Sequence, residues 1–72
     1  MTASIPRLGE REMEALRLVA EGWDNDEIAR RMAIENDSVR KKLNRLYDKI
    51  GLPAGPEINR RVLAALCWRE QH

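Results

Sequence analysis

The sequence predicts an all-helical domain, and three observations support this fold class. The chain has 72 residues, the size of one small domain. Strong helix formers such as Ala, Leu, Arg and Glu dominate the composition, whereas β-branched residues are few. Apolar residues recur at helical spacing in several stretches, and glycine or proline separates these stretches. We therefore expect four helices in a domain spanning residues 8–69, with a flexible N-terminal arm at 1–7 and a tail at 70–72.

The first expected helix covers residues 9–21. Gly9 can serve as its N-cap, and Glu12 is placed to bond back to the cap amide and to oppose the helix dipole. Gly22 supplies a residue that can adopt the left-handed conformation that ends a helix. The apolar residues expected to be buried are Met13, Leu16, Val19 and Ala20.

The second and third expected helices cover residues 25–32 and 36–50. Asp24 is a strong N-cap for the first of them, with Glu27 three residues later, and Ile28, Ala29 and Met32 form one apolar face. The turn between them contains Ile34 as its buried residue, and either Glu35 or Asn36 caps the helix that follows. Gly51 ends that helix, and Leu52 and Pro53 after it fit the usual stop.

The helix at 36–50 has an apolar stripe and a basic arc opposite it. The stripe consists of Val39, Leu43, Leu46 and Ile50, which recur at helical spacing and must face a core. The arc consists of donors suited to base edges or phosphates: Arg40, Lys41, Asn44 and Arg45, with Ser38, Lys42 and Lys49 at its rim.

Positive charge is concentrated on this one helix. Residues 1–36 hold five basic and eight acidic side chains, whereas residues 37–51 hold five basic and two acidic ones. A charged arc on an arbitrary helix is usually only a solvated face. Here a short helix, a tight turn and a longer basic helix follow one another, which is the layout of a helix-turn-helix that places its second helix in a DNA major groove.

The fourth expected helix covers residues 56–69 and carries more apolar surface than one core-facing stripe requires. Pro56 is well suited to a first helical position. The excess apolar surface indicates either contact with another chain or coverage of the edge of a small core. The residues proposed for a dimer interface are Val62, Leu63, Leu66 and Trp68.

The composition excludes several classes of function. Cys67 is the only cysteine and His72 the only histidine, so neither an internal disulfide nor a metal-ligand cluster is expected. No catalytic pair, glycine-rich phosphate loop or room for a substrate cleft is present, so we expect no enzyme and no cofactor. The N-terminus lacks a signal-peptide core and no stretch could span a membrane, which predicts a cytoplasmic protein.

Three motifs together resemble the LuxR-type (LuxR/GerE-like) helix-turn-helix domain. They are L-G-E-R-E-M-E-A-L-R-L-V-A-E-G at residues 8–22, N-D-E-I-A-R-R-M-A-I at 25–34 and S-V-R-K-K-L-N-R-L-Y-D-K-I-G-L at 38–52. The resemblance implies double-stranded DNA as partner and a homodimer through the fourth helix, formed either in solution or only on DNA. It implies base contacts at Arg40, Lys41 and Asn44, and backbone contacts at Asn25, Ser38, Lys42 and Lys49. Arg45 joins the backbone contacts from its place on the arc.

Departures from the family pattern bear on affinity. Asp26 stands where the family often has lysine, Glu35 replaces the usual serine cap, and Lys42 replaces a common histidine. Carboxylates near phosphates weaken DNA binding, so a low affinity or help from a dimer is expected. The alternatives are a module that binds a partner regulator, with weak or lost DNA binding, and a sigma-factor-like promoter-binding domain.

Overall fold

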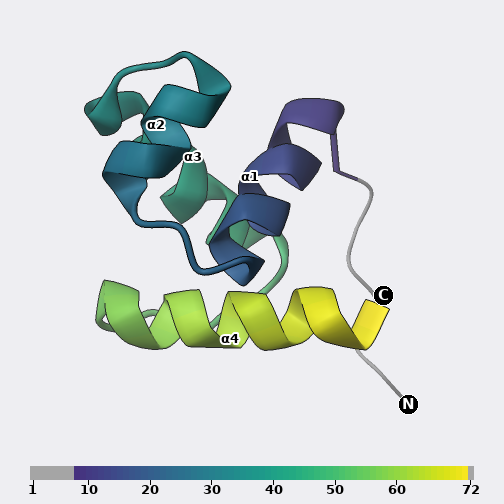
Figure 1. Cartoon of the computed structure of the whole chain (residues 1–72). Coiled ribbons are helices and arrows are strands. Elements are labelled where there is room, and N and C mark those ends of the chain that lie inside the picture. Colours follow the sequence, from purple (N-terminus) through teal and green to yellow (C-terminus); the bar gives the residue numbers. More distant parts are fainter. Residues whose placement is uncertain (1–7, 72) are drawn as a thin grey trace.

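The computed structural model describes residues 8–71, and four α-helices make up most of this range (Figure 1). They are α1 (Glu10–Ala20), α2 (Asn25–Met32), α3 (Asn36–Lys49) and α4 (Glu57–Gln71). The predicted all-α fold is confirmed. The helix ends differ from the expected ones by at most two residues, and α4 continues to Gln71 where a tail was expected. The arm expected at residues 1–7 lies outside the described residues.

The helices α2 and α3 pack against each other, and α1 contacts all three of the other helices. In Figure 1, α4 runs across one end of this group and lies next to α1. Among residues 8–71, no helix is long and apolar enough to cross a membrane.

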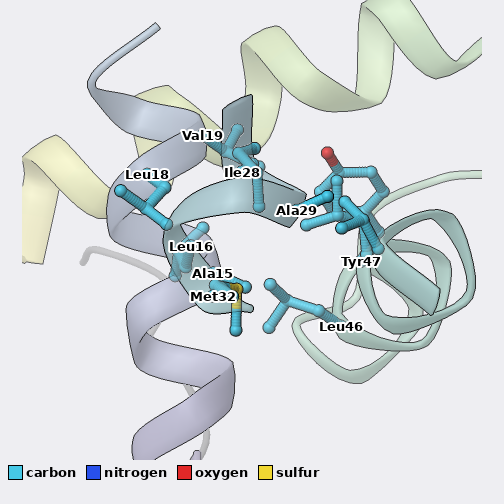
Figure 2. Close-up of a cluster of buried hydrophobic side chains, with 12 residues drawn as sticks. Ala15, Leu16, Leu18, Val19, Ile28, Ala29, Met32, Leu46 and Tyr47 are labelled. Carbon is cyan, nitrogen blue, oxygen red and sulfur yellow. The ribbon is translucent and has the colours of Figure 1, made fainter. Parts of the chain in front are cut away.

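The core lies between α1, α2 and α3 and is closed by α4 (Figure 2). The expected stripe of α3 is buried at Val39, Leu43 and Leu46, and Ile50 packs at its edge. In α1 the expected burial of Met13 and Ala20 is wrong, because both are only half-buried. Since α1 contacts three helices, its buried arc is wider than the stripe expected from the sequence and is centred on a different side of the helix. This arc consists of Ala15, Leu16, Leu18 and Val19.

The helix ends follow the cap chemistry that the sequence predicts. The backbone N–H of Gly9 donates to Glu12 Oε1 at 3.0 Å, and the N–H of Glu27 donates to Asp24 Oδ1 at 2.9 Å. Gly51 has a φ of +81°, which allows the N–H of Leu52 to reach back to the carbonyl of Tyr47 at 3.0 Å. At the start of α3 the N-cap is Glu35, whose side chain makes no capping bond, and the stronger capping residue Asn36 is already helical.

Ala33 ends α2 in the left-handed conformation, with a φ of +57°. This conformation costs an L-residue about 1–2 kcal/mol, and glycine avoids that cost but loses more entropy on folding. We expect Ala33→Gly to raise the free energy of unfolding by about 0.5–1 kcal/mol in urea titrations. Ala54→Gly, in the exposed loop before α4, is the control and should be neutral or destabilising. Equal destabilisation by both changes would contradict the prediction.

The core-facing side of α4 contains an arginine. Arg60 is 9% exposed, its Nη2 lies 2.6 Å from Asp48 Oδ1, and its guanidinium lies over the Tyr47 ring at 5.3 Å from the centroid. Ala64 and Trp68, one and two turns further along, pack on the same side. The large apolar residues on the outer side are Ile58, Val62, Leu63 and Leu66, which are 38–71% exposed.

Candidate nucleic-acid interface

The turn between α2 and α3 fixes the direction of the basic helix. The left-handed Ala33 lets the N–H of Ile34 donate to the carbonyl of Ala29 at 3.0 Å, and the Ile34 side chain packs against the core. Across the turn, Asn36 Nδ2 donates to Asp26 Oδ1, which joins the first residue of α3 to α2. With its apolar stripe buried, α3 must turn its basic arc outward.

The polar residues expected on α3 share one surface. Arg40, Lys41, Asn44, Arg45 and Ser38 are exposed, whereas Lys42 is half-buried. A hollow of about 220 Å³ is lined by Asp37, Arg40, Lys41 and Asn44, so the three expected base-contacting residues lie together. A neighbouring groove of about 320 Å³ is lined by Glu12, Ser38, Lys41, Lys42 and Arg45. Lys41 borders both.

The cations of this surface form no ion pairs with carboxylates, whereas those of α1 and α2 do. This holds within residues 8–71 for Arg40, Lys41, Lys42 and Arg45, although Lys42 is near enough to Glu12 to help lower the pKa of that carboxyl group. In α1, by contrast, Arg11 and Arg17 pair with Glu14 and Glu21.

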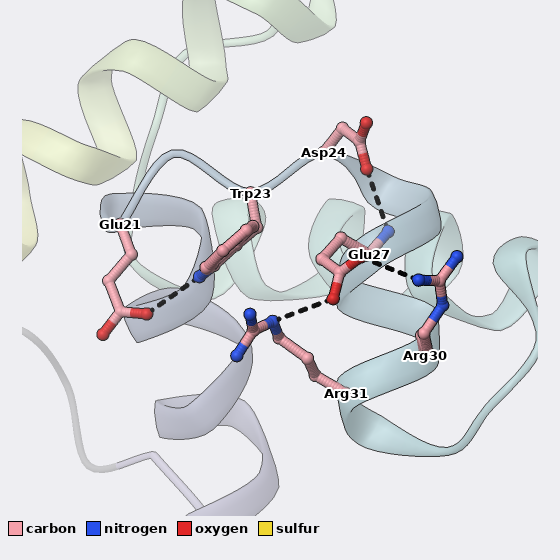
Figure 3. A network of polar contacts seen from close by, with 6 residues as sticks. All are labelled: Glu21, Trp23, Asp24, Glu27, Arg30 and Arg31. Atoms are coloured by element: carbon pink, nitrogen blue, oxygen red, sulfur yellow. Dashed lines mark hydrogen bonds and ion pairs between the residues drawn. The ribbon is translucent and has the colours of Figure 1, made fainter.

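Figure 3 shows the corresponding network around α2. Glu27 pairs with both Arg30 and Arg31, at 3.3 and 3.1 Å. Arg31 also lies over the Trp23 ring, 3.8 Å from its centroid. Trp23 Nε1 donates to Glu21, and this bond, followed by the one from Arg17, lowers the pKa of Glu21. The cations of α1 and α2 are therefore paired with carboxylates of the same segment, and the acidic excess of residues 1–36 remains.

Lys49, expected to contact the DNA backbone, is already paired. Its Nζ lies 3.0 and 3.3 Å from the two carboxylate oxygens of Glu12, at the start of α1. The Gly9 N–H first, and Lys49 second, lower the pKa of Glu12. A lowered pKa means that this carboxylate contributes stability above its unfolded pKa, which is lost as pH falls through the folded value. The pair joins residues 37 positions apart, so no local pattern in the sequence indicates it.

Asn25 is an expected backbone contact that lies outside α3, as the first residue of α2. Its Oδ1 accepts a hydrogen bond from Arg61 Nη1 of α4 at 2.8 Å. Sequence reasoning did not predict this contact between Arg61 and Asn25, because a partner in a distant helix leaves no signal in spacing.

Of the residues expected at a dimer interface, Val62, Leu63 and Leu66 are exposed on α4. Trp68 instead packs against the core and is partly buried. Ile58, which lies one turn before Val62 and is 71% exposed, completes the apolar surface.

No metal site is formed by the part of the chain that the structure describes, since no three His, Cys, Asp or Glu side chains gather there. Cys67 is half-buried on α4, and burial raises the pKa of its thiol. A raised thiol pKa is the opposite of what a reactive cysteine requires.

Asp26 provides a test of how α2 faces DNA. Because a carboxylate near phosphates opposes binding, Asp26→Lys should tighten duplex binding without changing the preferred sequence. The same change should lower the melting temperature, because it removes the bond from Asn36 and a favourable negative charge worth about 0.3–1 kcal/mol at a helix N-terminus. Asp26→Asn is the matched control, since it removes the charge and keeps an acceptor, and it should give intermediate affinity. Unchanged or weaker binding by folded Asp26→Lys would show that α2 does not approach the phosphates.

Comparisons with known proteins agree with this geometry. The family model described as bacterial regulatory proteins, luxR family, matches residues 6–62. The chain is 41% identical over 56 residues to a "Probable transcriptional regulatory protein SgaR" of Hyphomicrobium methylovorum. That match covers 78% of this chain but 24% of the relative, so the chain spans about a quarter of the relative's length. No solved structure matches the chain significantly.

Proposed function

Because this chain belongs to the luxR family of bacterial regulatory proteins and forms a DNA-binding helix-turn-helix domain, we propose that it reads duplex DNA by placing α3 in the major groove. The observation that carries this proposal is the polar arc of α3, on which four cations form no ion pair with a carboxylate within residues 8–71. The function is regulation of transcription. We propose no catalytic role and a cytoplasmic location, where bacterial DNA is found.

Base reading is assigned to Arg40, Lys41 and Asn44, which line one hollow of α3. Arg and Lys donate to the O6 and N7 acceptors of guanine, and Asn pairs with the N6 and N7 edge of adenine. These residues would therefore distinguish base pairs by their major-groove edges.

Contacts to the DNA backbone are assigned to five other residues. Phosphate contacts set the register of a protein on the duplex and supply most of its affinity. Ser38, Lys42 and Arg45 line the neighbouring groove, and Lys49 pairs with Glu12 of the same groove. Asn25 lies in a separate hollow at the start of α2. Lys49 already pairs with Glu12, so binding a phosphate replaces one anion by another. Its contribution to the binding free energy is therefore smaller than that of an unpaired lysine.

Two copies are proposed to associate through the outer surface of α4, made of Ile58, Val62, Leu63 and Leu66. Large apolar side chains exposed together on one helix are typical of a protein interface. Trp68 is left out of this surface because it packs against the core. A homodimer would bind paired half-sites whether it forms in solution or only on DNA. A partner regulator is the alternative occupant of the same surface.

The assignment of base readers is tested by alanine substitution. Lys41→Ala or Asn44→Ala should cost roughly 1–3 kcal/mol of binding free energy and relax the preference at one base pair. Lys49→Ala should weaken binding to all duplex sequences alike, and by a smaller factor, because Lys49 is already paired with Glu12. Arg69→Ala, an exposed position near the end of α4, is the matched control for lost charge. Measured affinities for a set of single-base variants of the bound duplex decide the matter. A uniform loss for every substitution would contradict the assignment.

A further inference from the structure

Arg61 of α4 holds the segment that leads into α2. Its Nη1 donates to Asn25 Oδ1 at 2.8 Å, and its Nη2 donates to the backbone carbonyl of Trp23. Glu57, one turn earlier in α4, lies 3.6 Å from the same guanidinium. The Arg61 side chain is 22% exposed, so these contacts are largely shielded from water. One side chain of α4 thus contacts both the loop before α2 and the first residue of α2.

The chemistry of the guanidinium fixes the orientation of the Asn25 amide. Arginine offers five N–H donors and no acceptor, whereas an asparagine amide has an acceptor oxygen on one side and an NH₂ donor on the other. The oxygen must therefore face Arg61, and the NH₂ group is turned away from it. Without Arg61 the amide could rotate and present either group to a ligand.

We propose that Arg61 is a positioning residue for DNA binding. It keeps the Asn25 amide turned so that Nδ2 donates to a phosphate at the N-terminus of α2. Helix N-termini favour anions, because their first N–H groups and the helix dipole point outward. A neutral donor held there gives a directional contact to a phosphate beside Asp24 and Asp26, the carboxylates that line the same hollow. The inference rests on the proposed function, since the acceptor is a duplex phosphate.

The same contact links two functional surfaces. Arg61 and the apolar residue Val62 are neighbours on α4, and Arg61 faces α2 while Val62 is 56% exposed. The helix proposed for association therefore also sets a backbone contact of the helix-turn-helix.

A double-mutant cycle on duplex affinity tests the proposal. Asn25→Ala should weaken binding about tenfold, the effect of losing one hydrogen bond to a charged group. Arg61→Met should weaken binding about fivefold when Asn25 is present and less than about twofold when it is alanine, because its effect passes through Asn25. Arg61→Lys keeps the charge but cannot span both acceptors, so it should restore only part of the affinity. Arg69→Met controls for lost charge, and thermal unfolding of each variant confirms that it is folded.

The isosteric change Asn25→Asp identifies the atom that faces DNA. It preserves the contact with Arg61 but replaces the outward NH₂ with an oxygen. It should therefore bind DNA more weakly than Asn25→Ala, while its melting temperature is at least that of the unsubstituted protein. Three results would each overturn the proposal. They are an equal loss of affinity from Arg61→Met with Asn25 and with alanine at position 25, full restoration of affinity by Arg61→Lys, and unimpaired binding by Asn25→Asp.

The same experiments separate the failure of this proposal from the failure of the proposed function. If the proposal failed but Lys41→Ala still changed base preference, the proposed function would stand. Absence of sequence preference in every variant would instead remove the proposed function itself.

Discussion

Replacing Tyr47 by alanine should leave most of the domain unfolded at room temperature, whereas replacing it by phenylalanine should preserve or raise stability. Tyr47 is 0% exposed and is the largest fully buried side chain of the core. Loss of such an aromatic side chain costs about 3–5 kcal/mol. Domains below about 70–80 residues rarely have more than about 3–5 kcal/mol of stability. The alanine variant therefore loses nearly all of it.

The phenylalanine variant isolates the hydroxyl group. Within the described residues the Tyr47 hydroxyl is buried and has no hydrogen-bond partner, and it projects from the ring in Figure 2. A buried polar group without a partner costs about 1–3 kcal/mol, so its removal should not be harmful. Burial also raises the pKa of this phenol above 10.0. Because the folded pKa is raised, stability is full below the unfolded pKa and falls as pH rises past it. Tyr47→Phe should lose this alkaline sensitivity.

Urea unfolding at neutral and alkaline pH measures both variants. Arg40→Ala, at an exposed position of α3, is the control and should leave unfolding nearly unchanged. A loss of more than about 1 kcal/mol in Tyr47→Phe, comparable to that of a broken hydrogen bond, would show that the hydroxyl has a partner.

The features predicted from the sequence are those that neighbouring residues determine. The stripe Val39, Leu43 and Leu46 gives α3 its buried face, and this face in turn orients the basic arc. Gly9, Asp24 and Gly51 mark helix ends through bonds that span only a few residues. These signals are short-range, so spacing alone reveals them.

What the sequence did not reveal depends on contacts between distant helices. Arg60 lies on the core side of α4, where a charged residue is not expected. It is accommodated there because Asp48 and the Tyr47 ring compensate its charge. Ala64 and Trp68 pack on the same side as Arg60, whereas the other large apolar residues of α4 are exposed: Ile58, Val62, Leu63 and Leu66. Arg61 likewise reaches Asn25 only through the packing of α4 against the other helices.

Affinity for a bound duplex should fall steeply with salt. Five cations of α3 lie on the proposed DNA surface, of which Lys49 is already paired with Glu12. Contact with about four to six phosphates gives a slope of log K against log[salt] near −4 to −5. Between 50 and 200 mM salt this corresponds to a fall in affinity of roughly 250- to 1000-fold.

Two variants calibrate the salt titration. Lys42→Ala removes one phosphate contact and should make the slope shallower by about 1. Asn44→Ala removes a neutral base contact, so it should lower the affinity and leave the slope unchanged. A flat salt dependence of the unsubstituted protein would contradict the placement of these cations against DNA.

Selection of bound duplexes from a random pool tests most directly whether α3 reads DNA sequence. We expect one enriched motif, arranged as paired half-sites about one helical turn, or roughly 10 base pairs, apart, as a symmetric dimer requires. The Lys41→Ala protein, selected in parallel, should lose the preference at one position of each half-site and keep the others. A pool that contains no enriched motif, although the protein is folded and the salt is low, would contradict the account.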